Sequence, residues 1–377
     1  MTFNCDGPDF NAYRSTYDII GNAKADVYHA TYMEWGYTTL MILGNKIGLD
    51  FFAFRIILSF ICLWLFCSTI KHYKANGNLI IGLYMIYLFF FDTIQIRNCI
   101  SQFIILFATR FLFKKSWVAT LKYIVCVAVA AGFHTISWVY LSFLLIKLSN
   151  KKSFYRNLSI FAGALFVVSV LIKPVLPQIV NYVVKLIGHG EGYLQGSIFI
   201  GYWIVLAIHL IGMIPLYVFR NGVKDKAALA NIDNILKVNI VLCLFLPLTL
   251  LNNNFNRIFR NNMILTQIGL VLMFARSNKN SRSSKAALGS LILLNAGWFV
   301  SDILMRYEIT NIISPIMEKN LIFNLTSSAN IVQYILITVL CLFVLFIAKI
   351  LTSKEPVRQP KRDKGPKEAR QNKCLYR

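Results

Sequence analysis

Three arginines lie at the edges of apolar stretches, where charged side chains are otherwise scarce. Arg97 opens the apolar stretch 97–113, and Arg257 and Arg260 lie in an asparagine-rich segment between two later apolar stretches. A guanidinium close to hydrocarbon is costly and is usually retained for a partner, and its planar donor groups match the oxygens of a phosphate. We therefore predict that Arg97, Arg257 and Arg260 bind the diphosphate of a lipid-linked substrate. The alternative is an interfacial arginine that pairs with a nearby carboxylate.

A histidine and two carboxylates are the candidate proton acceptors. His134 lies at the end of an apolar stretch, and an imidazole can take a proton from a sugar hydroxyl near neutral pH. Asp9 and Glu34 belong to a semi-polar N-terminal segment, in a chain with only 16 acidic residues. We predict His134, Glu34 and Asp9 as catalytic residues; a structural hydrogen-bond donor is the alternative role for His134. The other acidic residues considered for this role are Asp26, Asp92, Glu191, Asp302 and Glu308.

Two further polar residues have simpler interpretations. Asp92 lies five residues before Arg97, so these two side chains could form an ion pair. His209 lies in the middle of the apolar stretch 198–219 and is expected to make a hydrogen bond between two helices.

Aromatic residues near the arginines are candidates for stacking on sugar rings. We predict this role for Trp35, Tyr37 and Tyr193, although an aromatic belt at the membrane interface explains them almost as well. The eight cysteines and five histidines form no cluster with metal-ligand spacing, and the sequence has no P-loop and no metalloprotease motif. We therefore expect a reaction without a metal or cofactor.

The elements that position these residues are apolar stretches long enough to cross a membrane. The chain is 57% hydrophobic and only 15% charged, whereas soluble proteins contain about 25% charged residues. Because about 20 apolar residues span a bilayer, we predict an all-α, polytopic transmembrane bundle of about 11 spans. The predicted spans are 51–70, 79–95, 97–113, 117–132, 135–149, 157–173, 198–219, 235–252, 262–275, 286–304 and 331–351. The stretch 117–149 also fits one helix plus a half-helix.

The basic residues predict an orientation. They fall on alternate connectors and in the C-terminal tail, so one face of the membrane holds nearly all of them, and that face is expected to be cytoplasmic. The net charge of +23 is therefore explained by the orientation of the chain in the membrane and not by binding to nucleic acid. The arginines and His134 then lie at the external face, with the N-terminus outside and the C-terminus in the cytoplasm. The predicted parts are an external segment 1–50, a helical domain 51–351 with external loops near 174–197 and 305–330, and a basic cytoplasmic tail 352–377, expected to be disordered.

These residues lie in short sequence elements whose order along the chain resembles that of a known family. The elements are Gly7-Pro8-Asp9-Phe10-Asn11-Ala12-Tyr13, Glu34-Trp35-Gly36-Tyr37-Thr38-Thr39-Leu40, Arg97-Asn98-Cys99-Ile100-Ser101 and Phe133-His134-Thr135-Ile136-Ser137. Together with Arg257 after a polar turn, they resemble the EpsG/Wzy-like family of bacterial polysaccharide polymerases. Asn98 and Ser101 replace the usual Gln and Ala of the third element. Members of this family usually begin with one more helix, so the resemblance predicts either a missing first helix or a misplaced start.

The resemblance implies a membrane glycosyltransferase with a GT-C-like helical fold. Its implied activity is the transfer of a growing glycan from undecaprenyl diphosphate onto a lipid-linked repeat unit, at the external face of the bacterial inner membrane. Such products are O-antigen, capsule or exopolysaccharide. The partners implied are the lipid-linked oligosaccharide and membrane lipids, with a chain-length regulator and a flippase as candidate membrane partners.

Three other functions remain open at this point. A flippase or transporter of lipid-linked oligosaccharide needs charged residues along a central pathway, and the predicted spans hold few. An O-antigen ligase-like glycosyltransferase would share the external arginines and His134, so the sequence separates it poorly from a polymerase. A sugar acyltransferase is the remaining alternative.

Overall fold

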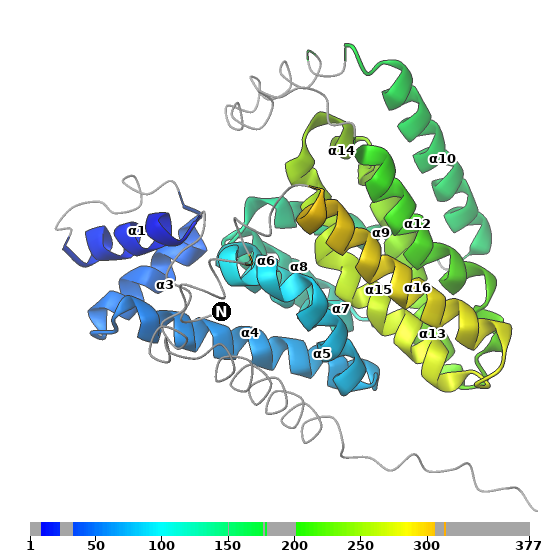
Figure 1. Cartoon of the computed structure of the whole chain (residues 1–377), viewed down its shortest axis with the longest axis horizontal. Helices are drawn as coiled ribbons and strands as arrows, with labels where there is room; N and C mark the ends of the chain where they lie inside the picture. The colour runs from blue at the N-terminus through cyan, green and yellow to red at the C-terminus, as the bar shows by residue number, and fades with distance from the viewer. Residues whose placement is uncertain are drawn as a thin grey trace, which may run out of the picture.

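The computed structural model describes residues 9–22, 33–149, 151–175, 178, 201–305 and 313 (Figure 1). Every regular element in these ranges is a helix, which confirms the all-α prediction. The predicted last span 331–351 and the basic tail 352–377 lie outside the described residues, as do most of the two predicted external loops.

An N-terminal group of helices lies at one side of the molecule (Figure 1). It consists of α1 (Phe10–Asn22), α3 (Trp35–Lys46) and the first turns of α4 (Phe51–Tyr73). The Tyr17 ring packs on the rings of Phe51 and Phe54, and its hydroxyl donates to the Leu49 carbonyl at 2.9 Å. Asn45 donates to the Tyr17 carbonyl at 3.1 Å. Aromatic packing and side-chain hydrogen bonds therefore fix α1 and α3 against α4.

The middle of the fold is built from shorter helices. A bent pair, α5 (Gly77–Ile86) and α6 (Leu88–Ile94), turns by 65° at Tyr87. It leads into α7 (Ile96–Leu112), α8 (Trp117–Ala131), the 3₁₀-helix η1 (Thr135–Leu144) and α9 (Leu145–Leu148). With 15 and 10 residues, α8 and η1 extend only about 22 and 20 Å, less than the hydrocarbon thickness of about 30 Å.

The C-terminal half of the described chain is a set of helices around α15 (Asn256–Arg276). Its neighbours include α7, α12 (Tyr202–Val218), α13 (Lys226–Leu242) and α16 (Arg282–Phe299), and nearly all of α15 is buried. The outermost helix, α10 (Lys152–Leu171), is largely exposed. The other elements are η3 (Arg220–Gly222), η4 (Cys243–Phe245), α14 (Leu248–Leu251), η5 (Asn253–Phe255) and the π-helical turn η6 (Val300–Leu304).

Polar side chains hold this buried centre together. Asn262 and Thr266 both donate to the Asn239 side-chain oxygen, at 3.2 and 3.0 Å, and Gln267 donates to Asn295 at 3.0 Å. His209 forms a hydrogen bond with the Asn239 carbonyl at 3.0 Å, which confirms its predicted role between two helices. Such bonds matter in a membrane because there is no water to satisfy these groups.

The described residues include five helices long and apolar enough to cross a membrane: α4, α10, α13 with η4, η5 with α15, and α16 with η6. The bent pair α5–α6 makes a sixth if it is one span. Three shorter apolar helical stretches are α8, η1 with α9, and α12. The chain is therefore a multi-pass membrane protein, while the predicted number of about 11 spans is not confirmed.

Two predicted span boundaries are wrong. The span predicted at 235–252 corresponds to α13, which begins nine residues earlier because the Asp225 side chain caps it, accepting from the Ala227 and Ala228 N–H groups. The span predicted at 262–275 corresponds to α15, which begins at Asn256. Arg257 and Arg260 therefore lie in the first turns of a helix and not in a loop.

The basic connectors gather at the end of the bundle opposite to Arg97 and Arg257. Arg97 opens α7 and Arg257 opens α15, and both helices run to the basic end. There, Lys74 and Arg276 line one pocket, and Lys147 donates to the Lys114 carbonyl at 2.7 Å.

Candidate functional site

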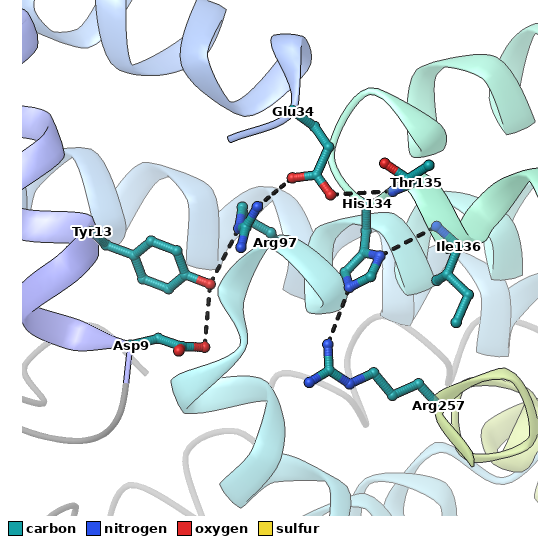
Figure 2. Close-up of polar contacts among 8 residues, drawn as sticks. All are labelled: Asp9, Tyr13, Glu34, Arg97, His134, Thr135, Ile136 and Arg257. Carbon is teal, nitrogen blue, oxygen red and sulfur yellow. Dashed lines mark hydrogen bonds and ion pairs between the residues drawn. The ribbon is translucent and has the colours of Figure 1, made fainter. Parts of the chain in front are cut away.

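Three side chains predicted from the sequence meet at one end of the bundle (Figure 2). Arg97 lies in the first turn of α7, His134 precedes η1, and Arg257 lies in the first turn of α15. Glu34, which precedes α3, joins them from the N-terminal group. Figure 2 shows His134 in contact with Arg257, while Arg97 is linked through Glu34 to Thr135, the residue after His134, so four separate segments build one polar cluster.

The guanidinium of Arg97 is held from two sides. Its Nη1 donates to Glu34 Oε2 in an ion pair, and its Nε donates to the Tyr13 hydroxyl at 3.3 Å. The guanidinium also lies over the Tyr13 ring, 5.4 Å from its centre, and Tyr13 in turn donates to Asp9 Oδ2 at 3.5 Å. A quarter of the Arg97 side chain is still exposed, since its relative accessibility is 25%. A substrate can therefore reach it.

The suggested ion pair between Asp92 and Arg97 is not formed. Asp92 is buried in α6 and accepts a hydrogen bond from the Tyr84 hydroxyl at 3.0 Å. The carboxylate partner of Arg97 is Glu34, which lies 63 positions away in the sequence.

Glu34 connects the N-terminal group to the segment that carries His134. Its Oε1 accepts a hydrogen bond from the Thr135 N–H at 3.2 Å. Beside it, the Gly36 N–H donates to the Gly132 carbonyl at 2.7 Å. A Cβ on Gly36 would lie 2.7 Å from that carbonyl oxygen, so the close approach requires glycine. These contacts place the Glu34 carboxylate between Arg97 and the backbone next to His134.

Both ring nitrogens of His134 have a close partner. Nδ1 accepts a hydrogen bond from the Ile136 N–H at 3.3 Å, and Nε2 lies 3.2 Å from Arg257 Nη1. Burial, followed by the positive charges of Arg257, Arg97 and Arg260, lowers the pKa of His134 from 6.5 to about 3. The imidazole is therefore neutral at physiological pH.

Arg260 lies apart from the other two arginines. Its guanidinium is buried, where it donates to Asp302 Oδ2 at 3.3 Å and to Gln95 Oε1 at 2.8 Å. The Phe91 ring lies 4.5 Å from it, and Tyr87 also donates to Asp302. Arg260 was predicted to bind diphosphate with Arg97 and Arg257, but here it is part of a buried ion pair.

The sequence profile of the EpsG family matches residues 1–313, which include every residue of this cluster. The chain belongs to the EpsG family. Its apolar helices make it a multi-pass membrane protein. Family membership implies, at a coarse level, a glycosyltransferase-like polysaccharide polymerase that acts on lipid-linked saccharides. No curated protein and no solved structure matches the chain.

The aromatic residues predicted to stack on sugars differ in exposure. In this EpsG-family protein Tyr37 has no exposed surface and packs against Tyr13 and Phe54. A ring without exposed surface cannot stack on a sugar, so the prediction for Tyr37 is corrected. Trp35 is 58% exposed and lies next to Gly132, while Tyr193 lies outside the described residues.

Two further residues contact the candidate site side chains, Tyr13 at Arg97 and Gln95 at Arg260, and neither was predicted from the sequence. Tyr13 follows Asp9 by four residues, and this helical spacing was the signal that could have joined them. Nothing in the sequence indicates a contact between Gln95 and Arg260, because the two residues are far apart in the chain and only the fold brings them together. Of the other acidic residues considered, Asp26, Glu191 and Glu308 lie outside the described residues.

The cluster combines two cationic groups, a neutral imidazole and a carboxylate. Within the part of the chain that the structure describes, no group of three or more His, Cys, Asp or Glu side chains is placed to hold a metal ion. Two guanidinium groups supply fixed positive charge, which is suited to binding phosphate oxygens.

Proposed function

We propose that this EpsG-family protein is a polysaccharide polymerase of the bacterial inner membrane. It would transfer a growing glycan from undecaprenyl diphosphate onto a lipid-linked repeat unit. The observation that carries this proposal is that two guanidinium groups share one cluster, with Arg257 in contact with His134 and Arg97 linked to the next residue through Glu34. In this proposal the two guanidinium groups bind the diphosphate, and Trp35 and Tyr193 contact the glycan.

The proposed orientation follows from the distribution of charge. The end of the bundle with Lys74, Lys114, Lys147 and Arg276 faces the cytoplasm, because basic residues favour that side of the membrane. The cluster around His134 then faces the periplasm, together with the N-terminus, and the C-terminus lies in the cytoplasm.

The proposed reaction exchanges one bond at the anomeric carbon of the donor. The acceptor hydroxyl oxygen forms a bond to this carbon, and the bond from the carbon to the phosphate oxygen breaks. Negative charge grows on the departing diphosphate, where Arg97 and Arg257 stabilise it. The hydroxyl proton passes to a basic group of the same cluster, for which His134, Glu34 and Asp9 are the candidates.

The test of this proposal is the length of the glycan made by arginine variants. We expect Arg97→Ala and Arg257→Ala each to reduce polymer formation roughly 100-fold or more, with the protein still present in the membrane. Arg276→Ala is the matched control, since Arg276 ends α15 at the opposite, basic end and pairs there with Asp225. Normal-length polymer from both Arg97→Ala and Arg257→Ala would exclude the proposed diphosphate site.

The alternatives predict other products when the gene is deleted. Loss of a polymerase leaves single repeat units on their lipid at the periplasmic leaflet, while loss of a flippase leaves them at the inner leaflet. Loss of a ligase leaves no glycan on the final acceptor, whereas loss of a polymerase leaves one repeat attached. Chemical crosslinking in the membrane would test for the proposed chain-length regulator and flippase.

A further inference from the structure

His134 is surrounded by hydrogen-bond donors on both of its ring nitrogens. A neutral imidazole has one N–H donor and one nitrogen with a lone pair. The Ile136 backbone N–H can only donate, and it points at Nδ1 at 3.3 Å. The lone pair therefore lies on Nδ1, and the proton of the neutral ring lies on Nε2.

The second contact then brings two donors together. Arg257 Nη1 lies 3.2 Å from His134 Nε2, and a guanidinium nitrogen cannot accept a hydrogen bond. Two N–H groups that converge in this way are both satisfied when an oxygen with several lone pairs receives them. A phosphate oxygen has this property, and its negative charge strengthens both hydrogen bonds.

We propose that His134 Nε2–H and Arg257 together donate hydrogen bonds to one phosphate group of the lipid diphosphate. In this role His134 is a catalytic hydrogen-bond donor that stabilises the leaving group, and it is not the general base. This inference rests on the proposed function, since it assigns a role within the same diphosphate site.

The surroundings of His134 favour this donor role. The ring is kept neutral by burial and by the charges of Arg257, Arg97 and Arg260, which lower its pKa to about 3. A neutral donor beside Arg257 adds a hydrogen bond to the anion without adding a third positive charge at the site. The position of the Ile136 N–H is itself fixed, because His134 caps the 3₁₀-helix η1 with this hydrogen bond.

The proton of the acceptor hydroxyl must then go to a carboxylate. Glu34 is the carboxylate held beside His134, since its Oε1 accepts a hydrogen bond from the neighbouring Thr135 N–H at 3.2 Å. When a diphosphate takes Arg97 as its counter-ion, the Glu34 carboxylate loses its ion-pair partner and keeps only the hydrogen bond from Thr135. Glu34 then accepts the proton while the new glycosidic bond forms and the diphosphate leaves on Arg257 and His134.

Two substitutions with the same amide group separate a donor from a base. The amide nitrogen of Gln in His134→Gln can reach the place of Nε2, so it keeps the donor but has no basic nitrogen. The shorter Asn side chain in His134→Asn reaches only the place of Nδ1. We would measure the affinity of the purified protein for undecaprenyl diphosphate in detergent, with undecaprenol as the phosphate-free control, and the polymer made in cells.

The expected result is that His134→Gln binds undecaprenyl diphosphate within about threefold of the wild type and still makes polymer. His134→Asn is expected to lose about tenfold or more in affinity, the effect of one hydrogen bond to a charged group. Normal binding by His134→Gln without polymer would overturn the donor role and make His134 the base, with the diphosphate site intact. Normal binding by His134→Asn would also overturn it. Absence of diphosphate binding in the wild type would instead remove the proposed function itself.

Discussion

The side-chain amides of Asn98 and Asn261 donate hydrogen bonds to each other, with nitrogen–oxygen distances of 3.0 and 2.9 Å. Both residues are buried, Asn98 in the first turn of α7 and Asn261 in the second turn of α15. Asn98 directly follows Arg97, and Asn261 lies one turn after Arg257. This reciprocal pair fixes the two helix starts in register, so it sets the separation of the two arginines proposed to bind diphosphate.

Removing one member of this pair should destabilise the protein. We expect Asn98→Ala to lower the free energy of unfolding by about 1–3 kcal/mol, because Asn261 is left with unsatisfied polar groups in a buried site. The double variant Asn98→Leu with Asn261→Leu should recover much of this loss, since neither polar group remains. Thermal unfolding in detergent measures both. A single variant as stable as the wild type would contradict this role.

The buried ion pair between Arg260 and Asp302 predicts a different phenotype from that of the two partly exposed arginines, Arg97 and Arg257. Arg260→Ala leaves the Asp302 charge buried without its partner, which costs about 3–5 kcal/mol. We expect the amount of protein in the membrane to fall, and we expect Arg260→Leu with Asp302→Leu to restore part of it. Arg97→Ala and Arg257→Ala, by contrast, should keep normal amounts. If Arg260→Ala accumulated normally but made no polymer, Arg260 would be a diphosphate ligand after all.

The contact between α3 and the His134 segment depends on Gly36. Because a Cβ there would lie 2.7 Å from the Gly132 carbonyl oxygen, we expect Gly36→Ala to cost about 1–3 kcal/mol. The N-terminal group should then become more sensitive to limited proteolysis. Gly163→Ala is the control, since no atom lies within 4 Å of its Cβ position in α10, and it should stabilise the protein by about 0.5–1 kcal/mol.

The sequence was sufficient to predict the helical membrane class and several residues that lie together in the candidate site. Arg97, His134 and Arg257 were identified by their types at the ends of apolar stretches, and the structure brings these ends together. The start of α15 could not be predicted in this way. Its asparagines favour turns over helix interiors when considered alone, and only the bonds from Asn261 and Asn262 to other helices make a buried helix favourable.

Side-chain contacts between residues far apart in the sequence could not be predicted from local sequence patterns. The Arg97–Glu34 contact spans 63 positions and the Arg257–His134 contact spans 123. Arg260 follows Arg257 by three residues in the same segment. Arg260 is nevertheless buried against Asp302, whereas Arg257 contacts His134. Residue type and spacing do not distinguish the two, because the difference depends on which neighbouring helix each side chain meets.

The lowered pKa of His134 predicts how stability depends on pH. The folded state holds the pKa near 3, whereas the unfolded value is about 6.5. Below pH 6.5 the unfolded chain binds a proton that the folded chain does not bind, so stability falls as the pH decreases toward 3. The charged groups whose electrostatic effect reaches the ring are Arg257, Arg97 and Arg260. We expect the stability lost between pH 7 and pH 5 to be about 2 kcal/mol smaller for His134→Gln than for the wild type, measured by thermal unfolding. Equal losses in both proteins would exclude this linkage.

Glu34 offers a test that separates binding from chemistry in a single side chain. Glu34→Gln retains an oxygen that can accept from the Thr135 N–H, but it removes the negative charge that competes with diphosphate for Arg97. We expect the dissociation constant for undecaprenyl diphosphate to fall by about two- to fivefold, the scale of a partly exposed ion pair. The transfer rate should nevertheless fall by about 10²–10⁴, because the amide cannot accept the proton of the acceptor hydroxyl.

Glu34→Asp is the matched control for this experiment, because it keeps the charge on a side chain one methylene shorter. Its rate should lie between those of the wild type and Glu34→Gln, with an affinity close to that of the wild type. A purely structural role for Glu34 predicts a different pattern, in which the amide variant loses affinity and rate together as α3 separates from Thr135. Tighter binding combined with slower transfer is therefore specific to a carboxylate that is paired with Arg97 at rest and accepts a proton once diphosphate has taken its place.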